Sequence, residues 1–286
     1  MNTALSVTTI QSQDRPVVRS AREDAHVQLP VRLSLFFSRG ISLDAWSTGG
    51  RLDRELMLYE ALQSRLESIA FVTYGGIEEL RFQDRVGSMT ILPNRWRLNS
   101  NLYSLLAPLL HARALRQATI FKTNQLNGAW CAAIAKLVFR KKLVVRCGFI
   151  WSDFYARLTP SAWKRRLARS VERVVVRYAD RIVVATEADR RYMVDQYQVD
   201  PAAVLVSPNF VDLEHFRPMP EIDREPGLLC FVGNLGVNKK LPALLEAIRD
   251  LPGVRLILVG EGTMRRQLEA AIKQDRLPVE LLGVLP

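Results

Sequence analysis

The sequence is poor in the residues that bind metals and form disulfides. Its 286 residues contain three cysteines and three histidines. Cys131, Cys147 and Cys230 stand far apart with no CxxC pair, and no histidine lies at metal-ligand spacing from them. These spacings exclude zinc-finger-type sites and a disulfide-stapled secreted domain. We therefore expect three buried, reduced thiols, no bound metal and a cytoplasmic protein.

Long hydrophobic runs are also missing. The most apolar stretches, such as residues 102–110, are short and interrupted, whereas a helix needs about 20 apolar residues to cross a bilayer. Residues 1–28 are polar, without periodicity and without the apolar segment of a secretory signal. We expect a disordered tail over residues 1–28 and no membrane-spanning segment.

Acidic residues are scarce in residues 1–220. The sequence has 40 Lys and Arg against 29 Asp and Glu, a formal net charge of +11. Residues 221–286 hold nine of each kind, so the excess of bases lies before them. Bases concentrate in residues 136–146, which contain no acid, and in residues 157–177, whose single acid is Glu172. The first part of the chain therefore meets an anionic partner or has a basic surface.

Short apolar runs alternate with amphipathic segments from Val31 onward. This alternation predicts a parallel sheet covered by helices on both faces. The expected strands and helices are strands 31–37, 69–74, 119–123, 143–146 and 181–186, and helices at about 52–66, 100–113, 128–139 and 162–178.

A Pro-rich polar stretch that ends at Pro226 interrupts this pattern. After it, strands at 228–233, 254–260 and 279–284 alternate with helices at 241–251 and 263–276. The break predicts a first domain over residues 29–208, a linker over 209–226 and a second domain over 227–286. The second domain would contain half of a doubly wound α/β fold.

A polar loop of the second domain places Lys239 and Lys240 at the start of a leucine-rich helix. Because the helix dipole is already positive there, the lysines are unfavourable unless an anion binds beside them, and phosphate is the usual one. Right-handed crossovers would place Gly233, Gly260–Glu261–Gly262 and Gly283 on the same rim of the sheet. The pattern predicts one end of a nucleotide-diphosphate site. The alternative is a solvated strand-to-helix turn.

A second glycine-containing turn, Ser47-Thr48-Gly49-Gly50, precedes the first predicted helix. As a functional element it would be a backbone cradle for a phosphate group. The alternative is an ordinary turn in which Ser47 or Thr48 caps the helix.

Residues 163–178 predict a basic amphipathic helix. Its apolar positions are Trp163, Leu167, Val171, Val174 and Tyr178, and six bases lie off that face. Such a helix is typical of proteins that bind an anionic membrane surface. The alternative is a helix whose apolar face packs on the sheet while its basic side faces solvent.

Several of these motifs resemble glycosyltransferase family 4. The loop from Gly233 to Lys240 is similar to that family's donor-phosphate loop. VRLILVGEGTMRRQLE is similar to its second strand, Gly-x-Gly turn and next helix, and VELLGVLP to its third strand. ADRIVVATEADRRYM and SPNFVDLEHFRP resemble the last strand and helix of the first domain and the interdomain signature. The resemblance covers residues 31–286.

This resemblance implies an α/β protein of the GT-B type, with two Rossmann-like domains that face a cleft. The first would be the acceptor side and the second, incomplete one would bind the donor nucleotide. The implied reaction moves a sugar from a nucleotide-sugar to a glycan or lipid-linked acceptor, as in polysaccharide biosynthesis, without a metal or other cofactor. The implied donor-binding residues are Gly50, Gly233, Asn234, Lys239, Lys240, Glu261, Gly262 and Val284. The implied acceptor-side residues are Gly49, Asn124, Cys147 and Gly148, and no catalytic residue is assigned.

The sequence departs from the family pattern at four places. Asn234 stands where the family has an arginine that helps to hold the diphosphate, and Phe210 replaces the glycine of the interdomain signature. Cys147-Gly148 replaces a His-Gly pair on the acceptor side. The family's Glu-x7-Glu pair would lie beyond Pro286. We therefore expect a truncated second domain and weak or no transferase activity in this fragment.

A different class of function is a basic, non-catalytic protein that binds nucleic acid or an anionic membrane surface. The sequence has no zinc spacing, no RNA-recognition aromatic signature and no clear helix-turn-helix, which disfavours nucleic acid. The expected partners are a nucleotide-sugar, a glycan or lipid-linked acceptor, and an anionic membrane. The expected location is the cytoplasm, with peripheral attachment to the inner face of the membrane as an extension of that prediction.

Overall fold

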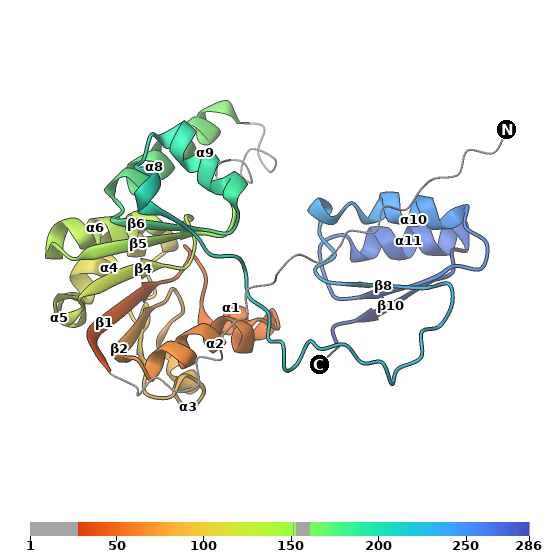
Figure 1. Cartoon of the computed structure of the whole chain (residues 1–286), viewed down its shortest axis with the longest axis horizontal. Helices are drawn as coiled ribbons and strands as arrows, with labels where there is room; N and C mark the ends of the chain where they lie inside the picture. The colour runs from red at the N-terminus through yellow and green to blue at the C-terminus, as the bar shows by residue number, and fades with distance from the viewer. Residues whose placement is uncertain (1–27, 151, 153–160, 286) are drawn as a thin grey trace, which may run out of the picture. The chain divides into compact units, whose positions relative to one another are not determined.

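A computed structural model describes residues 28–150, 152 and 161–285 of the chain. The chain divides into two compact units, Met1–Phe210 and Val211–Pro286 (Figure 1). The tail predicted over residues 1–28 lies outside the described residues except for Gln28. Among the described helices, none is long and apolar enough to cross a membrane.

The first unit is built on a seven-stranded parallel sheet with the order β3-β2-β1-β4-β5-β6-β7. The strands are β1 Leu29–Phe36, β2 Leu66–Val72, β3 Thr90–Leu92, β4 Ile120–Thr123, β5 Lys142–Cys147, β6 Arg181–Val184 and β7 Val204–Val206. The predicted parallel sheet is thereby confirmed. The short strands β3 and β7 at its two edges were not predicted.

Helices cover both faces of this sheet. They are α1 Leu43–Thr48, α2 Leu52–Gln63, α3 Gln83–Val86, α4 Ser100–Leu110, α5 Ala112–Gln117, α6 Ala129–Phe139, α8 Ala162–Tyr178 and α9 Glu187–Tyr197, with 3-10 turns η1 Ile77–Phe82 and η2 Pro201–Ala203. The helix predicted over about 100–113 is divided at His111 into α4 and α5. The helix predicted over about 52–66 ends at Gln63, because strand β2 begins at Leu66.

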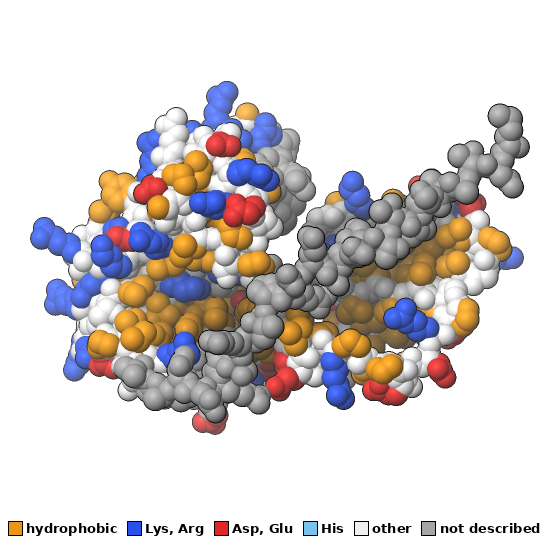
Figure 2. All heavy atoms as spheres, viewed as in Figure 1, with side chains coloured by type: hydrophobic (Ala, Val, Ile, Leu, Met, Phe, Trp, Pro, Cys, Tyr) orange, Lys and Arg blue, Asp and Glu red, His pale blue; other side chains and the backbone are white. Residues whose placement is uncertain are grey.

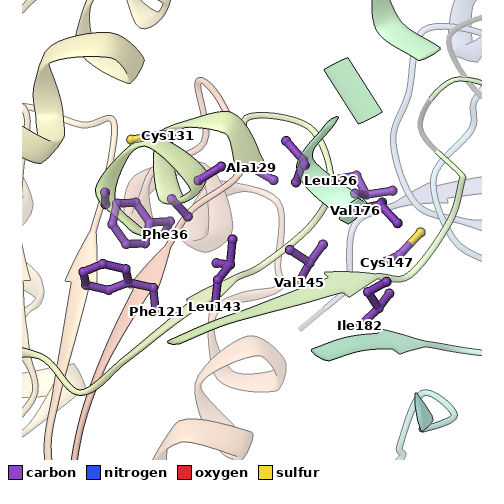
Figure 3. Close-up of a cluster of buried hydrophobic side chains, with 14 of the residues drawn as sticks. Phe36, Phe121, Leu126, Ala129, Cys131, Leu143, Val145, Cys147, Val176 and Ile182 are labelled. Atoms are coloured by element: carbon purple, nitrogen blue, oxygen red, sulfur yellow. The ribbon is translucent and has the colours of Figure 1, made fainter. Parts of the chain in front are cut away.

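The two faces of the sheet form separate cores. One core includes Leu35 and Phe71 and packs under α1, α2 and α3 through Trp46, Tyr59 and Val86. The other packs under α4, α5, α6, α8 and α9, and Figure 3 shows its side chains from the strands and from α6 and α8 close together. The second half of β1 is buried on both faces, whereas β4, β5 and β6 have one buried face and one partly buried face. Coverage of both faces agrees with the mainly apolar runs in the sequence.

Helix α8 contacts this core through a different face from the predicted one. Its buried residues are Ala168, Glu172, Val175 and Val176, and Tyr197 donates a hydrogen bond of 2.6 Å from its Oη to Glu172 Oε2. The apolar stripe from Trp163 to Tyr178 is largely exposed. The alternative in which this stripe packs on the sheet is wrong, because the buried face is instead formed by Ala168, Val175 and Val176 together with the hydrogen-bonded Glu172.

The second unit has a three-stranded parallel sheet with the order β10-β9-β8. Its elements are β8 Leu228–Val232, the 3-10 turn η3 Val237–Lys239, α10 Leu241–Arg249, β9 Arg255–Val259, α11 Arg265–Asp275 and β10 Val279–Gly283. Figure 1 shows both helices on the same side of the sheet. Cys230 of β8 is exposed, whereas Cys131 and Cys147 are buried. The prediction of three buried thiols is therefore wrong for Cys230, which lies on an edge strand.

Candidate functional site

Two glycine-containing loops of the second unit are bonded to each other at the carboxyl ends of its strands. Gly233 N–H donates to Val259 O at 2.9 Å, Leu235 N–H to Glu261 O at 2.9 Å, and Gly260 N–H to Gly283 O at 2.7 Å. A Cβ on Gly260 would lie 2.0 Å from Gly233 O, and one on Gly262 would lie 2.5 Å from the Leu235 backbone. The loops therefore need glycine here. The predicted common rim of Gly233, Gly260–Glu261–Gly262 and Gly283 is confirmed.

The two lysines of the first loop lie immediately before α10. Lys239 ends the 3-10 turn η3, and Lys240 has a left-handed backbone with φ of 52° at the N-terminal boundary of the helix. Both lysines and Asn234 are exposed. In the described part of the chain neither lysine forms an ion pair with an acidic side chain, so the positive charge beside the helix N-terminus is not neutralised from within the protein.

Two other predicted donor-side residues, Glu261 and Val284, differ from the lysines in their contacts. Glu261 forms an ion pair with Arg265 of α11, so its carboxylate is already partnered. Val284 follows β10 and is 67% exposed. The backbone carbonyl of Glu261 fixes the loop, and its side chain is tied to α11.

The first unit contains a cavity of about 320 Å³. Four separate segments line it: helix α2, strand β4 with the residues after it, strand β5 with the residues after it, and the segment that follows β7. The lining residues are Arg54, Glu55, Leu58, Tyr59, Lys122, Asn124, Gln125, Arg146, Gly148, Phe149, Ser207, Pro208, Asn209 and Phe210. The carboxyl ends of parallel strands are where ligands bind in sheets of this kind.

Hydrogen bonds hold the polar groups of this cavity in place. Lys122 Nζ donates to Tyr59 Oη at 2.8 Å, and an Arg146 guanidinium nitrogen donates to Asn209 Oδ1 at 2.7 Å. Gly148 N–H donates to Gln125 Oε1 at 2.9 Å. The cavity is therefore lined by fixed polar groups from elements that are distant in sequence.

Burial changes the acid–base properties of two of these groups. Loss of hydration, followed by the charge of Arg146, lowers the pKa of Lys122 to about 7. Loss of hydration also raises the pKa of Tyr59, so this phenol stays protonated at neutral pH. Lys122 can therefore gain or lose a proton near neutrality, which an exposed lysine does not do.

The predicted acceptor-side residues are only partly brought together. Asn124 and Gly148 line the cavity. The thiol of Cys147 belongs to the hydrophobic core and donates to Phe149 O at 3.1 Å, and burial raises its pKa. Cys147 is therefore not among the residues that line this cavity, and its acceptor-side role stays a prediction.

The turn at Gly49 and Gly50 lies between two helices. Ser47 and Thr48 are the last residues of α1, and Thr48 Oγ1 donates to Asp44 O at 2.9 Å. Neither of them caps α2, whose preceding residue Arg51 makes no side-chain cap. The predicted capping role is wrong. Gly50 has φ of 61°, and neither glycine is among the cavity-lining residues.

Sequence reasoning missed the charged residues of the cavity, Lys122 and Arg146. Each lies within a short, mainly apolar strand, Lys122 in IFKT and Arg146 in KLVVRC, which begins with Lys142. A sheet covered on both faces leaves no solvent for such a side chain unless it faces a cavity or a partner. A base within a mainly apolar strand was therefore the feature of the sequence that could have revealed the cavity. Within the described residues, no group of three or more His, Cys, Asp or Glu side chains gathers as a metal site.

Solved structures with similar folds include Anabaena HepE in complex with UDP, with a TM-score of 0.65 and 16% identity over 89% of this chain and 69% of that one. Sucrose-phosphate synthase from Thermosynechococcus elongatus has a TM-score of 0.61 and 15% identity over 89% of this chain and 71% of that one. With the parallel α/β sheets described above, these similarities define a GT-B fold.

A sequence model of Glycosyltransferase Family 4 matches residues 56–215, which is more than half of the chain. The chain belongs to Glycosyltransferase Family 4. Curated relatives include D-inositol 3-phosphate glycosyltransferases from Kineococcus radiotolerans, 37% identical over 112 residues, and Mycobacterium marinum, 34% identical over 97 residues. These matches cover 39% and 31% of this chain and 24% and 21% of the relatives. The matched part therefore spans about a quarter of the relatives' length.

Proposed function

We propose that this protein is a glycosyltransferase that moves a sugar from a nucleotide-sugar to a glycan or lipid-linked acceptor. The observation that carries the proposal is the bonded pair of loops at Gly233 and Gly260, with Lys239 and Lys240 beside the start of α10. Backbone N–H groups at a helix N-terminus and unpaired lysines are suited to a diphosphate. Family membership supports the same chemistry.

The nucleotide diphosphate would bind at these loops of the second unit. Lys239 is the principal contact in this proposal, with Lys240 as the alternative. Gly233, Gly260 and Gly262 allow the backbone to approach the ligand closely, and Asn234 supplies an amide where the family has an arginine. The acceptor would bind in the cavity of the first unit. Following the family, the reaction would need no metal or other cofactor.

The first test measures binding of nucleotide-sugars to the purified chain by calorimetry. Anabaena HepE was solved with UDP-glucose, which makes UDP-glucose the first member of a panel of UDP-, GDP- and ADP-sugars. Lys239→Ala should weaken binding by about 1.5–3 kcal/mol, the value of a hydrogen bond to a charged group. Lys273→Ala, at an exposed lysine on α11, is the matched control. Equal affinity of wild type, Lys239→Ala, Lys240→Ala and the double variant would contradict the donor assignment.

A second part of the proposal concerns a membrane. Trp163, Leu167 and Val174 on α8 are 64%, 54% and 53% exposed, and Leu137 on α6 is 59% exposed. An apolar groove of about 380 Å³ lies between the two helices, lined by Trp130, Ala133, Ile134, Leu137, Ser170, Val171, Val174, Val175 and Tyr178. Figure 2 shows blue basic side chains interspersed with orange hydrophobic ones over this part of the first unit.

We propose that this α6–α8 surface attaches the protein peripherally to the cytoplasmic face of an anionic membrane. Lys164, Arg166, Arg169, Arg173 and Arg177 are exposed on α8 beside the apolar groove. Bases near an anionic bilayer contribute about 1 kcal/mol each, and the apolar side chains would enter the boundary between headgroups and acyl chains. Charge complementarity therefore favours lipid over an uncharged protein partner.

Flotation with vesicles tests the attachment. Binding should require phosphatidylglycerol, weaken as salt is added, and fall in Trp163→Ser/Leu167→Ser and in Arg166→Gln/Arg169→Gln. Arg113→Gln/Arg116→Gln removes two exposed bases of α5 and serves as the charge-matched control. Binding to uncharged phosphatidylcholine at the same level, equal losses in the control, or preference for an oligonucleotide over the vesicles would refute the membrane assignment.

A further inference from the structure

The cavity of the first unit has an excess of positive charge. Its described lining includes three bases, Arg54, Lys122 and Arg146, and one acid, Glu55. Arg54 and Glu55 form an ion pair, with 2.9 Å between Nη2 and Oε1. Lys122 and Arg146 donate to the neutral groups Tyr59 Oη and Asn209 Oδ1. In the part of the chain that the structure describes, these two cations have no carboxylate partner.

The two cations lie on one face of the sheet. Lys122 of β4 is in register with Val144 of β5, and Arg146 follows Val144 by two residues. Residues two apart in a strand project on the same side, so Lys122 and Arg146 are neighbours on the side that α2 covers. Their mutual repulsion is one cause of the lowered pKa of Lys122. A bound anion would remove that repulsion.

We propose that this cavity binds a tetrahedral oxyanion, the phosphate group of a phosphorylated acceptor, between Lys122 and Arg146. The inference rests on the proposed function in that it specifies the class of acceptor. Arg146 offers a guanidinium, whose planar donors suit phosphate oxygens. Tyr59 Oη accepts from Lys122 and can donate its own proton to a third oxygen. Asn124, which also lines the cavity, can orient the uncharged part of the acceptor.

The size of the cavity agrees with a small ligand. Its volume of about 320 Å³ lies at the lower end of ordinary ligand sites. The Arg54–Glu55 pair on α2 and the Asn209 amide form the remaining polar wall. A phosphorylated sugar or polyol therefore fits this site better than a long neutral glycan, which would leave the partly buried charges of Lys122 and Arg146 without an anionic partner.

We expect the affinity of this cavity for sulfate to depend on pH. Sulfate keeps its charge throughout the neutral range, so any change in its affinity reports on the protein. The charged and titratable groups that face Lys122 are Arg54, Glu55, Arg146 and Tyr59, and burial raises the pKa of the Tyr59 phenol. Sulfate affinity should therefore fall as pH rises above about 7 and Lys122 loses its proton, approaching about tenfold per pH unit.

The experiment measures binding of sulfate, inorganic phosphate, acetate and glucose to the full chain by calorimetry at low salt. Lys122→Met and Arg146→Gln should each weaken sulfate binding about ten- to hundredfold. Lys122→Met should also remove the pH dependence. Arg116→Gln on exposed α5 is the control that should bind sulfate as the wild type does, and Lys239→Ala measures separately any sulfate that binds at the loops of the second unit. Sulfate and phosphate should bind more tightly than acetate, and glucose least.

The outcomes separate this inference from the proposed function. Unchanged sulfate affinity in both Lys122→Met and Arg146→Gln, or a loss confined to Lys239→Ala, would overturn the oxyanion site, even where UDP-glucose still binds through Lys239. Sulfate binding that depends on Lys122 and Arg146 supports the site even where no nucleotide-sugar binds, in which case the proposed function fails. If circular dichroism shows that Lys122→Met is unfolded, Arg146→Gln and the wild-type pH profile decide the question.

Discussion

Replacing Gly260 by alanine should disrupt the contact between the two loops of the second unit. The added Cβ would lie 2.0 Å from Gly233 O and 2.9 Å from its carbonyl carbon. Since both neighbours are backbone atoms, no side chain can move aside to relieve the clash. The backbone of one loop must shift instead, which weakens the bonds from Gly233 N–H to Val259 O and from Gly260 N–H to Gly283 O.

The size of the effect follows from two contributions. Gly260 has φ of +135°, a conformation that costs a non-glycine residue about 1–3 kcal/mol. Each of the two backbone bonds contributes about 0.5–1.5 kcal/mol. We expect Gly260→Ala to destabilise the second unit by about 2–6 kcal/mol. Gly253→Ala is the matched control, because Gly253 has φ of +76° and no atom within 4 Å of its added Cβ.

Hydrogen exchange measured by mass spectrometry can follow the two units separately. Peptides from residues 228–240 and 255–265 should lose protection strongly in Gly260→Ala and mildly in Gly253→Ala. All five tryptophans lie at or before residue 163, so tryptophan fluorescence reports on the first unit, and its unfolding transition should not move. Equal loss of protection in both variants would refute the close approach of the loops, leaving strain at positive φ as the entire effect.

Three further predictions concern charge and metal. Burial, followed by the charge of Arg95, lowers the pKa of His111 to about 4. The free energy of unfolding should therefore be highest above about pH 6.5 and fall by up to about 3 kcal/mol as pH approaches 4. Urea unfolding of His111→Gln should lack this decline. Burial raises the pKa of Asp180, but hydrogen bonds from Lys136, Leu143 N–H and Lys142 outweigh it and leave the pKa at about 2. The stabilisation by ionised Asp180 should be present above about pH 4 and be lost as pH falls towards 2. In urea unfolding at pH 7, Asp180→Asn should lower the free energy of unfolding by about 1–2 kcal/mol, allowing for solvent screening. An unchanged free energy of unfolding would refute the pairing. Dialysis against EDTA should leave sugar transfer unchanged, and a loss that added Mn²⁺ restores would contradict a metal-independent reaction.

The strands with long apolar runs could be predicted from the sequence because burial on both faces removes polar residues from them. The same reasoning could not find β3 and β7, which have three residues each. A run of that length, Thr90–Leu92 for example, is too short to show any period. These edge strands exist because neighbouring strands supply their hydrogen bonds, which is a tertiary cause.

In helix α8, the positions of the large apolar residues indicate the wrong core-facing side, because a buried glutamate lies on the side that packs on the sheet. The largest apolar residues, such as Trp163, suggested the core face, whereas Glu172 is on the face that is actually buried. Glu172 is accommodated because Tyr197 of α9 donates to it. The sequence contains no local sign of that partner, which lies 25 residues away. The exposed apolar stripe is therefore a structural finding, and it is what gives the membrane proposal its surface.

The two candidate sites differ in how the sequence encodes them. The loops at Gly233 and Gly260 contact each other through backbone atoms, so glycine is required at fixed short spacings. This pattern can be recognised in the amino-acid sequence alone. The cavity of the first unit is assembled from four segments, and Lys122 and Arg146 lie in two short strands that are mainly apolar. Substituting Lys122 or Arg146 changes the charge of the cavity without altering a glycine turn or a strand period. Under the proposed assignment, such a substitution would change acceptor binding in the cavity and leave the loops at Gly233 and Gly260 as they are.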